Sequence, residues 1–193
     1  MINPYSLNIK NNKKELEEFI LFSVAVAGKS AKQISIALDK FLYDQKDIKY
    51  HNKMTPFDII RFMVNDRTLF IRIKKSGLGK YHLLTKAYRQ LVLSQIDLKT
   101  CSTNDLENII GIGFKTSRFF IGYTRPNIKV AILDTHILKY LRNELNISDV
   151  PKSTPSSYNT YQKFENIFLK EAEKQKKSIK QLDLEIWNKY SRK

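Results

Sequence analysis

The residues of this sequence best suited to chemistry are one lysine and one aspartate. Lys115 follows the Gly-Ile-Gly turn at residues 111–113 and falls in the first turn of the helix that this turn predicts. A helix dipole disfavours a cation at that place, so the lysine is expected to meet a phosphate or to have another task. One such task is nucleophilic attack by the amine, which forms a Schiff base at a carbonyl-like carbon.

Asp134 is the candidate partner of this lysine. It follows the apolar run VAIL and precedes THILKYL, which predicts that its side chain caps a helix N-terminus. A purely structural cap is one interpretation. The other is that the carboxylate stabilises positive charge at a sugar C1′ and assists proton transfers while Lys115 attacks that carbon. The pair together indicates an enzyme that breaks a glycosidic bond.

The segment LENIIGIGFKTSRFF is typical of two short helices joined by a tight turn. Its glycines are expected to allow unusual backbone angles and the close approach of another backbone. The N–H groups that begin the second helix form an anion site, and DNA phosphate is the anion expected for a basic chain. An ordinary packing hairpin is the alternative. The predicted DNA contacts here are Gly111, Gly113, Phe114, Thr116 and Ser117.

The composition agrees with a nucleic-acid partner. The 193 residues carry a formal net charge of +15, which favours phosphate binding through counterion release, although a Lys-rich proteome would also explain it. Cys101 is the only cysteine, which excludes an internal disulfide and a Cys-ligated zinc or iron–sulfur cluster within one chain. The N-terminus lacks an apolar signal core, and FILFSVAVAG is too short to span a bilayer. A soluble, cytoplasmic protein is therefore expected.

Helical spacing dominates the chain, and VAILD at residues 130–134 is the single β-like run. Cap and breaker signals predict an all-α protein of about nine or ten helices. The expected N-caps are Asn11 or Asn12, Ser30, Thr55, Asn65 or Asp66, Thr103 or Asn104, and Asp134, and Gly77 is expected to end a helix in the left-handed conformation.

The combination of GIGFKTS at residues 111–117 with VAILDTHI at 130–137 resembles the helix-hairpin-helix GPD superfamily of DNA base-excision glycosylases. In lyase-active members the hairpin has the pattern Gly-apolar-Gly-x-Lys, and the essential Asp follows at about this distance. Residues 76–91 and 23–35 resemble further family segments, so the similarity extends over most of the chain. Lys29 lies at the turn whose residue, often Gln or Asn in relatives, enters the space left by the flipped base. Lys29 is expected either to fill that space or to contact phosphate.

Within this superfamily, the sequence is similar to the compact type-II class of 8-oxoguanine DNA glycosylase/AP lyases. It lacks the four-cysteine cluster of endonuclease III and the adenine glycosylases, and it has the hairpin lysine that three-methyladenine glycosylases usually lack. There is no room for the β-rich N-terminal domain of the large eukaryotic-type enzymes. The resemblance implies an all-α fold of two helical lobes with the cleft between them. Residues 1–26 and 127–193 would form the lobe with the catalytic Asp, and residues 27–126 the lobe that ends in the hairpin.

The resemblance also implies a role for each candidate residue. Lys115 and Asp134 would be catalytic, Trp187 would stack on the flipped base, Lys193 would recognise it through its carboxylate, and His136 would line the pocket. Packing is the alternative role for Trp187 and His136.

The resemblance implies no organic cofactor and no catalytic metal ion, although the family hairpin often binds a cation through loop carbonyls, here near Ile109 and Ile112. The expected partner of a monomer is double-stranded DNA containing 8-oxoguanine. Two rival functions stay open: a glycosylase/lyase for another lesion, such as an oxidised pyrimidine, and a non-catalytic DNA-binding protein.

Overall fold

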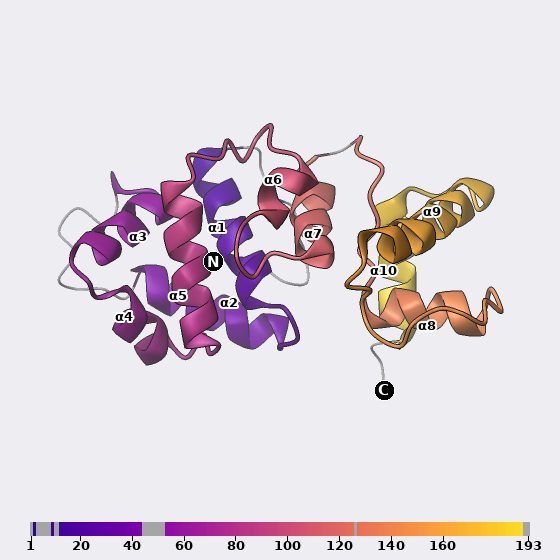
Figure 1. Ribbon diagram of the computed structural model, residues 1–193, viewed down its shortest axis with the longest axis horizontal. Coiled ribbons are helices and arrows are strands. Elements are labelled where there is room, and N and C mark those ends of the chain that lie inside the picture. The colour runs from indigo at the N-terminus through magenta and orange to yellow at the C-terminus, as the bar shows by residue number, and fades with distance from the viewer. Residues whose placement is uncertain (1, 3–8, 10–11, 44–52, 126, 191–193) are drawn as a thin grey trace. The chain divides into compact units, whose positions relative to one another are not determined.

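The computed structural model describes residues 2, 9, 12–43, 53–125 and 127–190, and in these ranges the regular elements are all α-helices (Figure 1). The predicted all-α class is therefore confirmed. The helices are α1 (Lys13–Ala25), α2 (Ala31–Tyr43), α3 (Pro56–Asn65), α4 (Leu69–Ser76), α5 (Tyr81–Leu93), α6 (Thr103–Glu107), α7 (Phe114–Thr124), α8 (Thr135–Asn143), α9 (Tyr158–Lys174) and α10 (Ile179–Tyr190). The β-like run at 130–134 joins no strand in the described ranges and leads directly into α8.

The chain forms two compact units, Met1–Ile112 and Gly113–Lys193. In the first unit α1 packs against α2, α3 and α5, and α5 also packs against α3 and α4. All ten side chains from Leu16 to Ala25 are buried, because helices of the same unit surround α1. This placement differs from the expected division, in which residues 1–26 join 127–193, and the discontinuous division stays a prediction.

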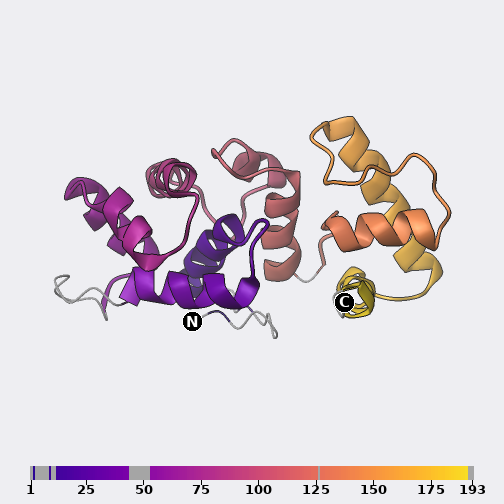
Figure 2. The same ribbon diagram turned by 90° about the horizontal axis from the view of Figure 1, so that it is seen from below.

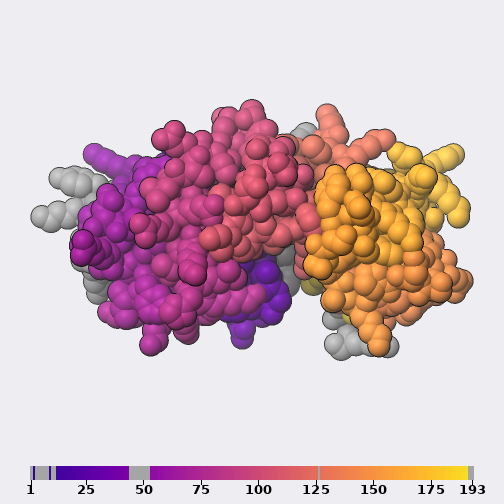
Figure 3. Space-filling view, viewed as in Figure 1, coloured from indigo at the N-terminus to yellow at the C-terminus, as the bar shows by residue number. Residues whose placement is uncertain are grey.

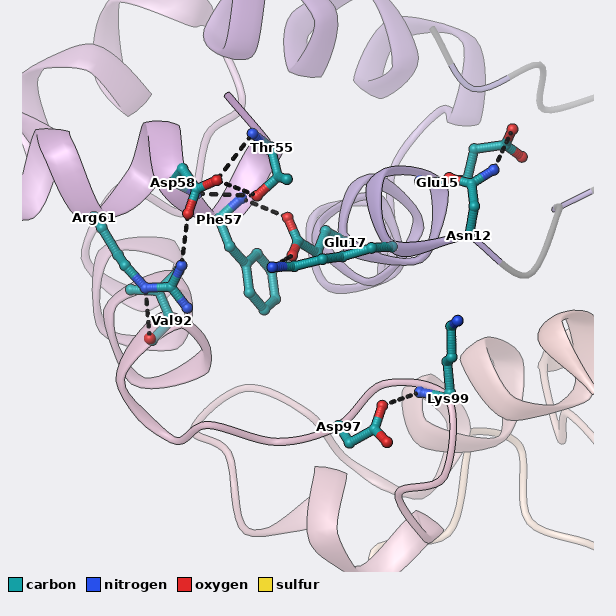
Figure 4. A network of polar contacts seen from close by, with 11 residues as sticks. Asn12, Glu15, Glu17, Thr55, Phe57, Asp58, Arg61, Val92, Asp97 and Lys99 are labelled. Carbon is teal, nitrogen blue, oxygen red and sulfur yellow. Dashed lines mark hydrogen bonds and ion pairs between the residues drawn. The ribbon is translucent and has the colours of Figure 1, made fainter. Parts of the chain in front are cut away.

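Polar side chains join the helices of the first unit at their ends (Figure 4). Thr55 and Asp58 form a capping box at the start of α3, with Pro56 at the first helical position, as the sequence predicts. The buried carboxylate of Glu17 on α1 accepts a hydrogen bond of 2.9 Å from the Phe57 N–H. A carboxylate at a helix N-terminus is stabilised by the helix dipole, so this bond fixes α3 to α1.

Two helices of this unit begin at other residues than the sequence suggests. The N-cap of α4 is Thr68, since Asp66 instead ends α3. The N-cap of α6 is Ser102, which forms a capping box with Asp105. Ser102 has the better position because its hydroxyl reaches the Asp105 N–H while the Asp105 carboxylate reaches back to the Ser102 N–H. The expected caps Asn12 and Gly77 are confirmed; the alternative Asn11 lies outside the described residues.

The second unit contains α7 to α10. Helix α10 packs against α8 and α9, which are drawn in orange to yellow in Figure 2. The apolar cluster of this unit includes Leu133, Tyr161, Phe168 and Ile186, with Phe114 of α7 against it. The side chains of these three helices appear in orange to yellow in Figure 3. No helix within the described ranges is both long and apolar enough to cross a membrane.

Candidate active site

The hairpin turn between α6 and α7 is built around one glycine. Gly111 has a φ of +85°, in the left-handed region, and a Cβ at this position would lie 3.2 Å from Leu83 Cδ1. Gly113 has a φ of −99°, so the prediction of an unusual backbone conformation at this residue is wrong. The space around its missing Cβ is open. Gly113 therefore leaves open space next to the backbone. Gly111 instead allows the left-handed conformation of the turn and the close approach of Leu83.

A glutamine on α5 holds this turn from one side. The Gln90 side-chain amide donates a hydrogen bond of 3.0 Å to the Asn108 carbonyl and accepts one of 2.9 Å from the Ile110 N–H. Leu83, which contacts the Gly111 position, lies two turns earlier on the same face of α5. Gln90 could not be identified from the sequence, because no local pattern links α5 to the hairpin.

Helix α7 begins at Phe114, so its first free N–H positions fall at the predicted anion site. The side chains there are less available than expected. The Phe114 ring packs against Tyr161, with ring centroids 5.5 Å apart. Ser117 is buried; its N–H donates to the Gly113 carbonyl and its hydroxyl to the Phe114 carbonyl. Thr116 is also buried, so any DNA contact in this region is expected mainly from backbone N–H groups.

Asp134 caps α8, as the sequence predicts. Its Oδ1 accepts hydrogen bonds of 2.8 Å from the His136 N–H and 2.9 Å from the Ile137 N–H. One carboxylate oxygen is thus held by backbone, and the side chain is half-buried. This arrangement fixes the orientation of the carboxylate while leaving its second oxygen for another partner.

Asp183 of α10 lies within electrostatic range of both Lys115 and Asp134. Burial and the Asp134 carboxylate raise the pKa of Asp183 to about 7, while a hydrogen bond from Tyr123 and the charge of Lys115 oppose the rise. The Tyr123 hydroxyl donates to Asp183 Oδ2 over 3.5 Å. Burial and the same two carboxylates raise the pKa of Tyr123. Within the second unit, Asp183 therefore interacts with one further carboxyl and with one amine.

Asp183 is a residue that the sequence analysis missed. It lies one helical turn before Trp187, a spacing that places both on one face of α10. That spacing from the candidate aromatic was the available signal. Asp183 and Tyr123 also line a cavity of about 470 Å³, with Lys129, Lys177 and Lys180 around it.

The remaining predicted residues lie in different surroundings. Trp187 is 44% exposed, so its ring is not a core residue of the second unit. His136 is half-buried in the first turn of α8. Lys193 lies outside the described residues. Lys29 is half-buried and its amine donates to the Leu78 carbonyl over 2.6 Å, a contact that a Cβ at Gly79 would block.

The fold and these residues define a helix-hairpin-helix protein with an amine and carboxyls beside its hairpin. The chain belongs to the 8-oxoguanine DNA glycosylase family, because the family model Ogg-HhH matches residues 5–177. It is also 36% identical over 85 residues to the 8-oxoguanine DNA glycosylase/AP lyase of Methanocaldococcus jannaschii. That alignment covers 42% of this chain and 38% of the length of the relative.

A solved structure supports the fold over nearly the whole chain. It is the crystal structure of the Methanocaldococcus jannaschii 8-oxoguanine glycosylase/lyase in complex with 15mer DNA containing 8-oxoguanine. The two structures have a TM-score of 0.65 at 22% identity, over 95% of this chain and 84% of that one. The similarity confirms the helical architecture expected from the sequence.

Proposed function

We propose that this protein removes 8-oxoguanine from double-stranded DNA and then cuts the strand at the resulting abasic site. The observation that carries the proposal is that a chain of this family has Lys115 in the first turn of the second hairpin helix, a backbone-held Asp134 carboxylate, and Asp183 within electrostatic range of both. An amine nucleophile with two carboxyls can perform both steps without a cofactor. All the groups come from one chain, which suits a monomer.

The first step would break the bond between sugar and base. The damaged nucleotide must leave the stack, because the atoms that react are inaccessible in the duplex. The lone pair of Lys115 Nζ forms a bond to C1′, the C1′–N9 bond breaks, and its electron pair leaves with the base. The base takes up a proton, and the bonded Nζ loses one. The Asp134 carboxylate, fixed by two N–H groups, stabilises the positive charge that develops on the sugar.

The second step would cut the strand. The C1′–O4′ bond breaks, O4′ takes up a proton, and Lys115 and C1′ form a Schiff base. Loss of a proton from C2′ then expels the 3′ phosphate by breaking the C3′–O3′ bond. Asp183 suits these transfers because a carboxyl with a pKa of about 7 both binds and releases protons near neutral pH.

Recognition of the base would fall to α10 and to the end of the chain. 8-Oxoguanine differs from guanine by an N7–H donor and an O8 acceptor, so an acceptor aimed at N7 distinguishes them by roughly 1–3 kcal/mol. The Lys193 carboxylate stays our candidate for that acceptor. The exposed ring of Trp187 is available to stack on a flipped base, and His136 to line the pocket.

The hairpin and the net charge would supply the DNA affinity. Backbone N–H groups at the start of α7 suit a phosphate, and the open space at Gly113 lets a backbone approach. Gly111 would act through the shape of the turn, and Lys29 through a phosphate contact that requires it to exchange its bond to Leu78.

A panel of labelled duplexes tests this function. The panel has four duplexes: one with a single 8-oxoguanine, one with a single oxidised pyrimidine, one with a single abasic site, and one without a lesion. Strand cutting is followed with and without alkali. We expect cutting of the 8-oxoguanine and abasic duplexes. Cutting of the oxidised-pyrimidine duplex but not of the 8-oxoguanine duplex would assign another lesion. Tight binding of every duplex without cutting would identify a non-catalytic DNA-binding protein.

A further inference from the structure

We propose that Glu165, Tyr161 and Arg118 are positioning residues that hold the Asp134 carboxylate in register with Lys115. This inference rests on the proposed function, in which both groups act on one sugar. It assigns a catalytic consequence to a buried polar network in the second unit whose members lie on α7 and α9.

The chain before Asp134 is held by side chains. Residues 130–134 are not helical and pair with no strand in the described ranges, yet Ala131 and Leu133 are fully buried. Buried backbone groups need hydrogen-bond partners. The Ala131 N–H donates to Glu165 Oε1 over 2.9 Å, and the Leu133 N–H donates to the Tyr161 hydroxyl over 3.0 Å.

The carbonyl groups of the same segment are satisfied in the same way. The Tyr161 hydroxyl donates to the Ala131 carbonyl over 2.8 Å, and the Thr154 hydroxyl donates to the Leu133 carbonyl over 2.8 Å. Side chains therefore replace a neighbouring strand for the two residues that lead into Asp134. A shift of Tyr161 or Glu165 would move the start of α8 and with it the carboxylate.

Arg118 joins this segment to the helix that carries the lysine. It lies on α7, one turn after Lys115, and its Nε donates to Glu165 Oε1 over 3.1 Å. The guanidinium also lies over the Tyr161 ring, 4.6 Å from the ring centroid. Glu165 therefore contacts α7 through Arg118 and the approach to Asp134 through Ala131, so one carboxylate couples the two catalytic positions.

The burial of this ion pair favours a role beyond stability. The Arg118 and Glu165 side chains are 5% and 9% exposed. Replacing both members of a buried ion pair by apolar residues is often neutral or stabilising, so stability alone does not require the charges. The ion pair does serve a purpose if α7 and residues 131–133 must keep fixed positions relative to each other.

Two matched double variants test the proposal. Arg118→Met with Glu165→Gln keeps an oxygen acceptor for the Ala131 N–H, whereas Arg118→Met with Glu165→Met removes it. Neither leaves a buried charge unpaired, so both should fold, which their melting temperatures check. Single-turnover excision of 8-oxoguanine at saturating enzyme is then compared, together with duplex affinity.

We expect the Met/Met variant to be about 100-fold slower than the Met/Gln variant, with equal duplex affinity, because a displacement near 1 Å costs about this factor. Tyr161→Phe keeps the ring, removes both hydroxyl contacts, and should be slower by about 10-fold. Equal rates in the two folded double variants would overturn the proposal. If the double variants do not fold, a wild-type rate in Tyr161→Phe overturns it instead.

Amide hydrogen exchange separates this proposal from the proposed function. The His136 and Ile137 N–H groups, which Asp134 holds, should exchange at least several-fold faster in Met/Met than in Met/Gln, and faster in Tyr161→Phe than in wild type. This result needs no activity on any duplex. A wild type without excision activity would therefore remove the proposed function, while unchanged exchange at both amides would remove the positioning role.

Discussion

Two irregular segments of this protein are held in place by side chains, but in opposite environments. The hairpin turn at residues 108–113 is held by the neutral amide of Gln90, at a part of the surface where Asn108 and Ile110 are exposed. The segment at 130–134 is held by Glu165 and Tyr161 in the core of the second unit. The first arrangement therefore lies at the surface, and the second lies in the interior.

The difference matches what each segment is proposed to do. The hairpin turn must present the N–H groups at the start of α7 to a phosphate of an incoming strand, so it gains nothing from burial. A carboxylate that stabilises a developing charge must already be oriented before reaction, and hydrogen bonds hold orientation best where water does not compete. Loss of a contact should therefore cost affinity at the hairpin and rate at the buried segment.

The largest effect is expected for Lys115→Gln. Without the amine no Schiff base forms, so strand cutting at 8-oxoguanine should fall at least about 1,000-fold. The variant should still bind undamaged duplex within a few-fold of wild type. Lys174→Gln is the matched control, because it removes a lysine of the same unit whose side chain is 78% exposed. A similar loss of cutting in that control would show that general charge is responsible.

Asp134 variants should separate its role as a cap from its role in chemistry. Asparagine caps helices about as well as aspartate, so Asp134→Asn should change the free energy of unfolding by less than about 1 kcal/mol. Its excision rate should nevertheless fall by about 100-fold or more, because the charge is lost. Asp134→Ala should lose the rate and also about 1 kcal/mol of stability. A wild-type excision rate in Asp134→Asn would show that Asp134 acts only as a helix cap.

The carboxyl of Asp183 should give the second unit a pH-dependent stability. Its pKa is raised to about 7, so between about pH 4 and pH 7 the folded chain binds a proton that the unfolded chain has lost. Stability from this group is present at low pH and is lost as pH rises through 7. Asp183→Asn should remove this loss and be more stable than wild type at pH 8 by up to about 4 kcal/mol, because each of the roughly three pKa units is worth about 1.4 kcal/mol.

Thermal unfolding of wild type and Asp183→Asn at several pH values measures this difference. The advantage of the variant should disappear as pH falls from 7 to 4. An advantage that stays constant over this range would show that Asp183 is ionised in the folded protein throughout.

The smallest effect is expected at the hairpin. Gln90→Ala removes two hydrogen bonds at an accessible site, so the affinity for undamaged duplex at fixed salt should weaken by about 2- to 10-fold. Excision at saturating enzyme should stay close to the wild-type rate. Gln162→Ala, which removes an exposed glutamine of α9, serves as control. A loss of excision rate rather than of duplex affinity in Gln90→Ala would contradict the proposed difference between the two segments.

Local signals in the sequence predicted much of this arrangement. The cap at Asp134 follows from an apolar run, an aspartate and a helical pattern, and it is present. The hairpin and the all-α class follow from glycine positions and apolar spacing. The predicted start of α6 was wrong because Ser102 competes with Thr103 and Asn104 for the N-cap position. Only the reciprocal hydrogen bond with Asp105 decides between them.

The long-range contacts could not be predicted in this way. Glu165 is separated from Arg118 by 47 residues and Gln90 from Ile110 by 20, so neither pairing leaves a periodic pattern. Glu165 in particular reads as one more charge on an amphipathic helix, although it is buried. A single sequence shows which face of a helix is apolar, but it does not show which buried polar group another element needs.

The central claim is that Lys115 bonds covalently to the sugar of a damaged nucleotide while Asp134 stabilises that sugar. Borohydride trapping of wild type on a duplex with a single 8-oxoguanine, followed by mapping of the modified peptide, tests it most directly. We predict a stable protein–DNA adduct, carried by the peptide that contains Lys115 and absent from Lys115→Gln. An adduct on a different lysine, or tight binding of the same duplex without any adduct, would contradict the account.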